Sequence, residues 1–146
     1  METKDKLVKQ LNKLRLDELY SRLLRIFLLT IFIILIPILI YDKFIEKDTL
    51  TALVLLLAEL LFIGIDIALY KGATEFFNLK NSRIYQCLEN TEAVTEIVVT
   101  PIKIVFEIKG MEDETIFLKP SDFRTEFIKN IAKVFGENRI ANIINN

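Results

Sequence analysis

Residues 26–41 have the sequence Ile26-Phe-Leu-Leu-Thr-Ile-Phe-Ile-Ile-Leu-Ile-Pro-Ile-Leu-Ile-Tyr41, which contains no charge. A helix rises about 1.5 Å per residue, and roughly 20 residues are needed to cross the hydrocarbon core of a bilayer. Two leucines precede the stretch, and the long side chain of Arg25 can reach the membrane surface. We therefore predict a membrane span over residues 23–41, kinked near Pro37.

A second apolar block, Leu50–Tyr70, follows a short charged connector at residues 42–49. Its 21 residues suit one span, Asp48 or Thr49 can cap its start, and Lys71-Gly72 can end it. A cleaved signal peptide is disfavoured because a long charged segment precedes the first block and the second block follows directly. The sequence predicts an antiparallel hairpin of two membrane-spanning helices.

Lysine and arginine residues predict the orientation of this hairpin. The connector carries only Lys43 and Lys47, whereas seven cations precede the first span. Cations are enriched on the cytoplasmic side of spans, so we expect both termini in the cytoplasm and the hairpin in the inner (cytoplasmic) membrane. The seven cations are Lys4, Lys6, Lys9, Lys13, Arg15, Arg22 and Arg25.

The composition excludes several classes of protein. The chain has 146 residues, of which 52% are hydrophobic, carries a net charge of -1 and contains no His. The single Cys87 can form neither a disulfide nor a His/Cys zinc site, and isolated glycines exclude a glycine-rich phosphate loop. The near-neutral charge disfavours duplex nucleic acid as a partner. No nucleophile with a base partner is visible, so we expect no enzyme, cofactor or metal.

The N-terminal residues 1–22 predict an amphipathic cytosolic helix. Leu7, Leu11 and Leu14 recur at helical spacing between charged positions. This helix is interpreted as an extension of the first span that lies on the lipid surface or packs on the C-terminal domain. A dedicated membrane-active segment is the alternative.

Residues 71–146 predict a small cytosolic α+β domain. Residues 73–90 have a mostly helical pattern, whereas residues 102–109 alternate between apolar and polar side chains as strands do. We expect an antiparallel sheet of about three strands with helices on one face. The other predicted elements are strands at 93–100 and 115–119, a helix capped by Ser121 or Asp122 and ended by Gly136, and a last helical turn at Ile140–Ile144.

Two acids in the second span are the strongest functional feature. Glu59 lies near its midpoint and Asp66 seven residues later, on the same helix face. A charge at the bilayer centre costs about 2.5–3.5 kcal/mol on insertion scales and usually faces a partner or a water-filled cavity. Folding the hairpin about its connector brings Arg25 level with Asp66, so these two can pair. Glu59 has no such partner, because the nearest polar group, Thr30, cannot neutralise a carboxylate.

Three roles are open for Glu59. It can stay protonated and hold helices together by a hydrogen bond, it can line a pore formed by several copies, or it can pair with another membrane protein. Gly64 and Ala68, on the opposite face, form a small-xxx-small pair that lets another helix approach closely. Two distinct contact surfaces favour a homo-oligomer.

One segment of the C-terminal domain, Lys119-Pro-Ser-Asp-Phe-Arg124, has a rationale for ligand binding. A helix that begins here points free N–H groups outward, and Lys119, Ser121 and Arg124 suit a phosphate. Asp122 argues against an anion, and the same residues also make an ordinary turn from strand to helix. More distant cations join the candidate ligand residues only if folding brings them close, namely Arg83, Lys103 and Lys109.

Two close membrane helices followed by a small cytosolic α+β domain resemble the membrane effectors of type III CRISPR defence. The resemblance covers the whole chain and rests on its architecture, on Glu59, and on the cationic Lys119 and Arg124. It implies a symmetric oligomer in which a cyclic oligoadenylate bridges several soluble domains and shifts the membrane part between states.

The sequence therefore predicts an oligomeric two-span membrane effector. Its cytosolic sensor domain is expected to bind a phosphate-rich signal, a cyclic oligonucleotide in antiviral defence, and to alter the membrane part. The alternative is a structural or accessory subunit whose hairpin docks to a larger membrane protein complex. A third hypothesis is a holin-like membrane disruptor without ligand control.

Overall fold

The computed structural model describes residues 1–142 and divides into two compact units. Leu16–Phe77 form the first, which we call the hairpin unit. Met1–Arg15 and the described residues from Asn78 onwards form the second, which we call the α+β unit. The first helix of the chain contributes residues to both units.

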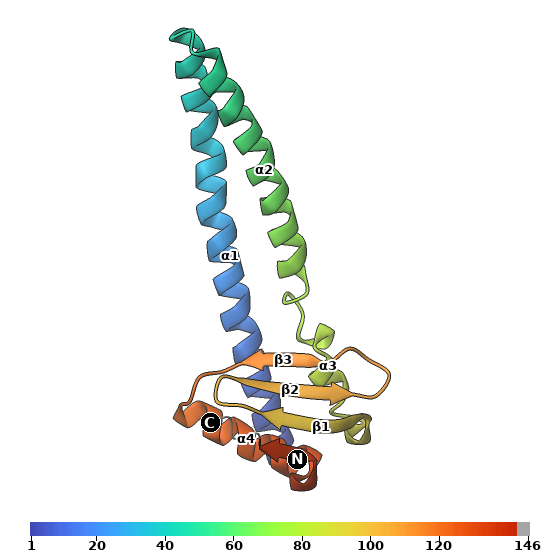
Figure 1. Cartoon of the computed structure of the whole chain (residues 1–146). Helices are drawn as coiled ribbons and strands as arrows, with labels where there is room; N and C mark the ends of the chain where they lie inside the picture. Colours follow the sequence, from blue (N-terminus) through green and yellow to red (C-terminus); the bar gives the residue numbers. More distant parts are fainter. Residues whose placement is uncertain (143–146) are drawn as a thin grey trace. The chain divides into compact units, whose positions relative to one another are not determined.

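The hairpin unit consists of α2 (Thr49–Thr74) and most of α1 (Glu2–Ile45), which lie side by side in Figure 1. α1 is a continuous helix of 44 residues with Pro37 inside it, so the predicted amphipathic helix and first span are parts of a single helix. The connector is shorter than predicted because both helices extend into it. Asp48 caps α2 by accepting a hydrogen bond from the Thr51 N–H (3.3 Å).

The side chains of α1 and α2 that are withdrawn from solvent alternate in spacing between three and four residues. This spacing is typical of the seam between two helices that pack with a left-handed twist. On α2 the seam residues are Ala52, Leu55, Glu59, Phe62, Asp66, Leu69 and Ala73. On α1 they include Ile26, Leu29, Ile33, Ile36 and Ile40.

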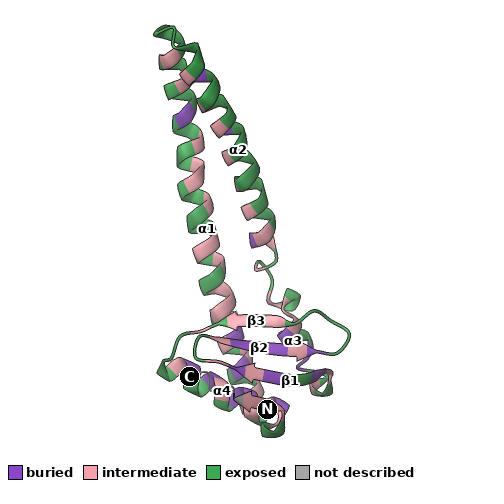
Figure 2. Cartoon of the chain, viewed as in Figure 1, coloured by how far each residue is buried: buried purple, intermediate pink, exposed green. Residues whose placement is uncertain are grey.

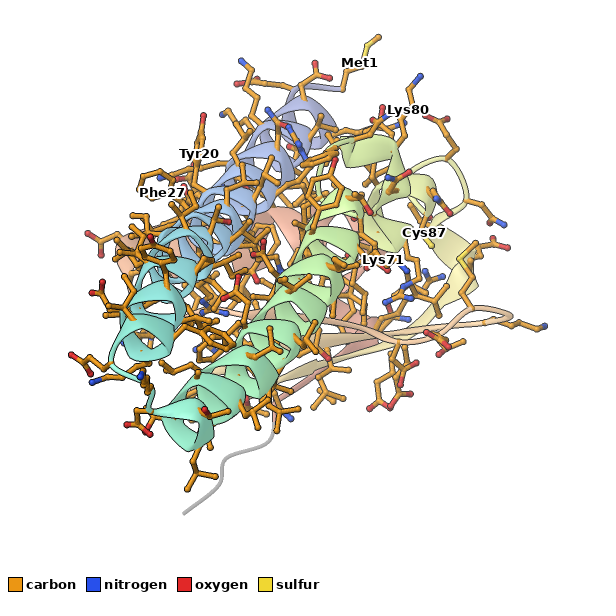
Figure 3. The ribbon with its side chains drawn as sticks, turned by 90° about the horizontal axis from the view of Figure 1, so that it is seen from above. Met1, Tyr20, Phe27, Lys71, Lys80 and Cys87 are labelled. Atoms are coloured by element: carbon orange, nitrogen blue, oxygen red, sulfur yellow. The ribbon has the colours of Figure 1, made fainter. Side chains whose placement is uncertain are left out.

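The other surfaces of the hairpin are apolar and exposed, as Figure 2 shows. Ile34 and Leu57 are 63% and 68% exposed. Tyr20 and Phe27 lie on the side of α1 that faces away from α2 (Figure 3). Both helices are long and apolar enough to cross a membrane, judged by length and composition. An apolar surface of this extent needs a partner or a lipid environment.

The α+β unit is built on a four-stranded mixed sheet with the strand order β3-β2-β1-β4. The strands β1 (Val94–Val99), β2 (Lys103–Ile108) and β3 (Glu114–Phe117) are antiparallel neighbours. The fourth strand, β4 (Ile140–Asn142), pairs with β1 in parallel. The predicted sheet of about three antiparallel strands is therefore wrong in its strand number and in being purely antiparallel.

The added strand replaces a predicted helical turn. Ile140–Ile144 was expected to be helical, but its described part is β4 (Ile140–Asn142), and the last two residues lie outside the described part of the chain. Gly136, with φ of 101°, ends α4 (Asp122–Phe135), and η3 (Glu137–Arg139) follows it. The strand forms against the open edge of β1, and a local sequence pattern contains no information about that distant edge.

The segment between hairpin and sheet is less helical than predicted. Polar side chains cap a new helix start within residues 73–90, so the segment forms short helices. Ser82 caps α3, and the Glu114 carboxylate accepts a hydrogen bond from the Ile84 N–H (2.8 Å). The short helices in this segment are η1 (Leu79–Asn81), α3 (Arg83–Gln86) and η2 (Thr91–Ala93).

The core of the α+β unit lies on one face of the sheet. Ile104, Phe106 and Ile108 of β2 are buried there, which confirms the alternation predicted for this strand. Leu7 and Leu11 of α1 are 0% and 4% exposed and belong to the same core cluster. Of the environments considered for the N-terminal segment, the structure shows packing on the C-terminal domain.

The burial of Leu7 generates a stability prediction. Leu7→Ala leaves a cavity in the core, so we expect it to destabilise the α+β unit by about 2–5 kcal/mol. Hydrogen exchange of the β1 and β2 amides in the full chain measures this loss. The control is Lys9→Ala, whose side chain is exposed on the same helix and should change stability by less than about 0.5 kcal/mol. Equal protection in the two variants would contradict the observed packing.

Candidate functional site

The two acids of α2 both lie in the seam. Glu59 and Asp66 are separated by two turns, and each occupies a seam position that faces away from the surrounding solvent or lipid. From Ile26 to Ile40 the seam residues of α1 are apolar except for Thr30. The two carboxyl groups are therefore placed inside a hairpin that offers them very few polar partners.

Glu59 is the more isolated of the two acids. Its residue is only 8% exposed, and its Oε2 atom is buried without a hydrogen-bond partner among the residues that the structure describes. A buried polar atom without a partner costs about 1–3 kcal/mol, and more when it is charged. The absence of a partner inside the hairpin was expected from the sequence. This carboxyl weakens the hairpin compared with an apolar residue of similar size.

Asp66 contacts the other helix through a threonine. The Thr30 Oγ lies 3.2 Å from Asp66 Oδ2 and 2.8 Å from the Ile26 carbonyl oxygen. A hydroxyl group has one proton to donate. The Thr30 hydroxyl is therefore shared between the two acceptors. The second Asp66 oxygen, Oδ1, is buried without a hydrogen-bond partner among the described residues.

The pairing of Arg25 with Asp66 that the hairpin geometry suggested is not present. The Arg25 side chain is exposed and forms no ion pair with any residue in the described part of the chain. Thr30 takes its place because it lies next to the seam position Leu29 and its short side chain reaches α2. The three-four spacing along the first block places Thr30 beside the seam, but it does not define which residue of α2 lies opposite.

The seam contains carboxyl oxygen atoms whose capacity to accept hydrogen bonds is unused. Among the described residues, Glu59 Oε2 and Asp66 Oδ1 are buried and have no hydrogen-bond partner. Water or a cation that enters the seam would therefore find two acceptors along α2, with Thr30 beside the second.

The face of α2 that carries Gly64 and Ala68 is open. Both residues are exposed, and a Cβ atom built on Gly64 would meet nothing within 4 Å. Among the residues that the structure describes, nothing occupies the space beside Gly64, so this face leaves room for a helix from another chain.

The α+β unit places the predicted phosphate ligands in different surroundings. Arg124 is 7% exposed, and its guanidinium donates to the carbonyl oxygens of Thr100, Pro101 and Leu118. These bonds fasten the start of α4 to the β1–β2 turn and to the end of β3. The guanidinium therefore has a structural role, and its donors are directed at the backbone.

The remaining candidates do not converge on one pocket. Ser121 caps α4 by accepting a hydrogen bond from the Arg124 N–H (3.2 Å), as predicted, and Lys119 is exposed beside it. Arg83 contacts Glu112 (3.4 Å) and the Asp113 carbonyl oxygen (3.1 Å) at the β2–β3 turn. That turn follows β2, whereas Lys103 is the first residue of β2, so Arg83 and Lys103 lie at opposite ends of the strand.

Comparisons with known proteins add no further constraint. No family model, curated protein or solved structure matches the chain. The interpretation of both sites therefore depends on their geometry.

The contacts of Arg124 predict a loss of stability on substitution. Arg124→Ala leaves three carbonyl groups without their donor, and we expect it to destabilise the α+β unit by about 2–4 kcal/mol. Arg124→Lys should recover only part of this loss, because one ammonium group cannot reproduce the planar guanidinium. Urea unfolding of the full chain measures both variants. Lys129→Ala, exposed on the same helix, is the control and should be near neutral.

Proposed function

We propose that the chain is a two-span membrane protein that acts on the membrane in which it is embedded. The support for two spans is the length and composition of α1 and α2 together with their exposed apolar surfaces. A bilayer would cover these surfaces, and the backbone groups of both helices are satisfied within each helix, as lipid requires. The excess of cations before the first span favours cytoplasmic termini.

The observation that carries the functional proposal is the unpaired Glu59 carboxyl. An apolar side chain at this position would stabilise the hairpin more, so the acid is not explained by packing. Ionisable groups inside membrane segments are by default functional candidates, most often in paths for protons or ions. We assign Glu59 and Asp66 to proton uptake and release in an effector that alters membrane permeability.

The α+β unit has the role of the sensor in this proposal. The exposed Lys119 and the capped start of α4 remain the predicted contact for a phosphate-rich ligand such as a cyclic oligoadenylate, as the resemblance to CRISPR membrane effectors implies. Arg124 is left out of this contact because its donors are used on backbone carbonyls. We therefore expect Lys119 to contribute most of the binding of the ligand.

The topology predicts a pattern of chemical labelling. Lys47→Cys in the connector should react with a membrane-impermeant maleimide added outside intact cells, whereas Lys80→Cys should react only after lysis. Both lysines are exposed, so the difference reports the membrane alone. Labelling of both cysteines in intact cells, or recovery of the chain in the soluble fraction, would contradict the proposal.

The role of Glu59 predicts a proton flux. Liposomes containing the full chain should acidify under an applied potential, and a cyclic oligoadenylate should increase the rate in the parent chain more than in Lys119→Ala. Glu59→Gln keeps the shape of the side chain but cannot ionise, so we expect at least a tenfold lower flux. Glu59→Asp, the matched control, should retain flux. A parent chain that conducts no protons with or without the ligand would overturn the effector proposal.

An accessory subunit is the second candidate function. The observation in its favour is the combination of a buried acid without a partner and an open small-residue face at Gly64 and Ala68. A partner helix with a lysine or arginine at the level of Glu59 would pair with its carboxyl group and would pack against the small residues. In that case Glu59→Gln would abolish co-purification with the partner complex, and the chain alone would carry no flux.

A further inference from the structure

The helices of the α+β unit cover one face of the sheet and leave the other face open. On β2 the partly exposed Lys103 and Val105 alternate with the buried core residues. Paired residues share a face, so Val105 lies beside Val98 of β1 and Thr115 of β3, and Lys103 lies beside Phe117. Phe117 is 75% exposed. We call this open surface the outer face.

Charges on the outer face are separated along β2. Lys103 begins the strand, Val105 follows at its centre, and Glu107 comes near its end. The exposed Lys109 follows just beyond the last residue of the strand. Glu107 pairs across the ladder with Glu96 of β1, and like charges in this position destabilise a sheet. In the described part of the chain, none of these three charged side chains, Glu96, Glu107 and Lys103, forms an ion pair. Along β2 the face thus presents a cation, then an apolar centre, then an acidic pair.

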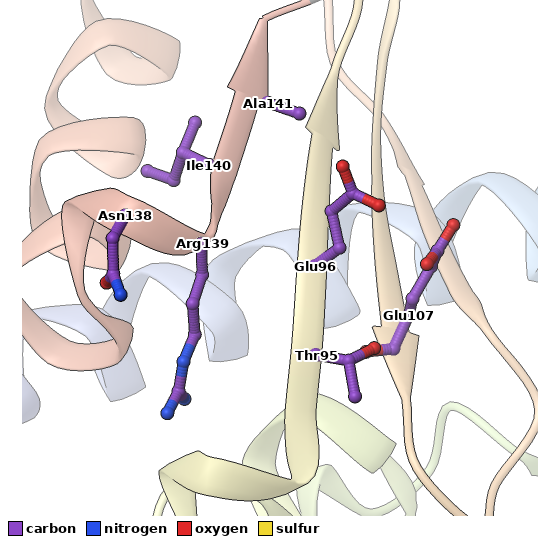
Figure 4. Close-up of a pocket in the computed structure, with 7 residues that line it drawn as sticks. All are labelled: Thr95, Glu96, Glu107, Asn138, Arg139, Ile140 and Ala141. Carbon is purple, nitrogen blue, oxygen red and sulfur yellow. The ribbon is translucent and has the colours of Figure 1, made fainter.

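The acidic pair lines a shallow hollow, drawn in Figure 4. Glu96 and Glu107 project from neighbouring strands, and residues of η3 and β4 line the opposite side. Arg139 also lines the hollow, but its guanidinium donates to the Thr91 carbonyl oxygen. The hollow therefore presents two carboxylates and one guanidinium that is bound to a backbone carbonyl, so one negative charge is left for a cationic side chain from outside to neutralise.

We propose that the outer face is the interface of a homodimer with two-fold symmetry. A two-fold axis that lies midway between the two copies, opposite Val105 and at right angles to β2, stacks the two sheets about 10 Å apart with their β2 strands running in opposite directions. Lys103 of each copy then enters the acidic hollow of the other copy. Val105 packs against its own counterpart, because Lys103 and Glu107 are equally distant from it along the strand.

The charge pattern selects this arrangement over the others. An axis parallel to the strands would stack Lys103 on Lys103 and Glu107 on Glu107, which repel each other. An anionic lipid surface or a nucleic acid would bring phosphate groups against Glu96 and Glu107. A second copy is the partner whose charges match both ends of the face at once.

The dimer is independent of the proton site. All residues of the outer face belong to the α+β unit, whereas the seam residues from Ile26 to Ile40 and on α2 belong to the hairpin unit. A chain that dimerises but conducts no protons would leave this inference intact and overturn only the effector proposal. A chain that conducts protons but does not dimerise would overturn this inference and leave the effector proposal intact.

Charge exchange tests the interface in the full chain in detergent, with mass measured by light scattering over a range of concentrations. Lys103→Glu places like charges at both ends of the interface, so we expect the dissociation constant of the dimer to rise at least tenfold. The double variant Lys103→Glu with Glu107→Lys restores opposite charges and should recover most of the affinity. Lys129→Glu makes the same change of net charge on the exposed side of α4 and should leave the dimer unchanged.

Cross-linking tests the position of the axis. Val105→Cys lies opposite the axis, so a short bismaleimide should join two copies of this variant in membranes. Lys129→Cys should give no dimer, and the parent chain is the background, because burial and the nearby Glu114 carboxylate raise the pKa of the Cys87 thiol and reduce its reactivity.

Two results would overturn the inference. One is a parent chain that is monomeric at all concentrations and is not cross-linked through Val105→Cys. The other is an oligomer whose stability is the same in Lys103→Glu, in the double variant and in Lys129→Glu. That second result would place the contact between copies elsewhere, for example on the open face of α2.

Discussion

The seam between α1 and α2 is the constraint on which the hairpin unit depends. Two apolar helices in lipid gain nothing from hiding apolar surface from each other, so they associate only through close packing and polar contacts. The alternating spacing of seam residues provides the packing, with Ala52 and Ala73 near the two ends of α2. The polar contact that the structure shows across the seam is that between Thr30 and Asp66. Glu59 sits between these features and contributes to neither.

The two units differ in how they are stabilised. The α+β unit has a closed apolar core in which the first turns of α1 pack with the sheet and α4, and Arg124 satisfies three backbone carbonyls at its edge. The hairpin has few buried residues and many exposed apolar ones, so it relies on its surroundings. α1 takes part in both, because Leu7 and Leu11 belong to the core while Ile26 to Ile40 belong to the seam.

Local patterns were sufficient for most elements of the fold. The two long apolar helices follow from uninterrupted hydrophobicity, the buried face of β2 from its alternation, and the start of α4 from the Ser121 cap. β4 was missed because three residues carry no detectable period and its partner β1 is about 40 residues earlier in the chain. The continuity of α1 across its charged and apolar parts agrees with the interpretation of the N-terminal segment as an extension of the first span.

The candidate sites were less predictable than the fold. The positions of Glu59 and Asp66 on one face follow from helical periodicity, but the partner of Asp66 depends on the register between two helices, which one helix alone does not define. Arg124 was interpreted as a ligand for an anion because it is a cation near a helix start. Its actual acceptors lie up to 24 residues away in sequence and meet it only in the folded unit.

The threonine in the seam links the chemistry of one helix to the shape of the other. While the Thr30 hydroxyl donates to the Ile26 carbonyl, it adds a second bond to a carbonyl of its own helix, an arrangement that often bends helices. The same hydroxyl lies 3.2 Å from Asp66 Oδ2, so donation to Asp66 would remove the second bond. A change in the contact between the two helices would thus be recorded as a local change in the curvature of α1. The vibrational frequency of the Ile26 carbonyl, shifted by isotope labelling, would then report a contact made by a residue 40 positions away in sequence.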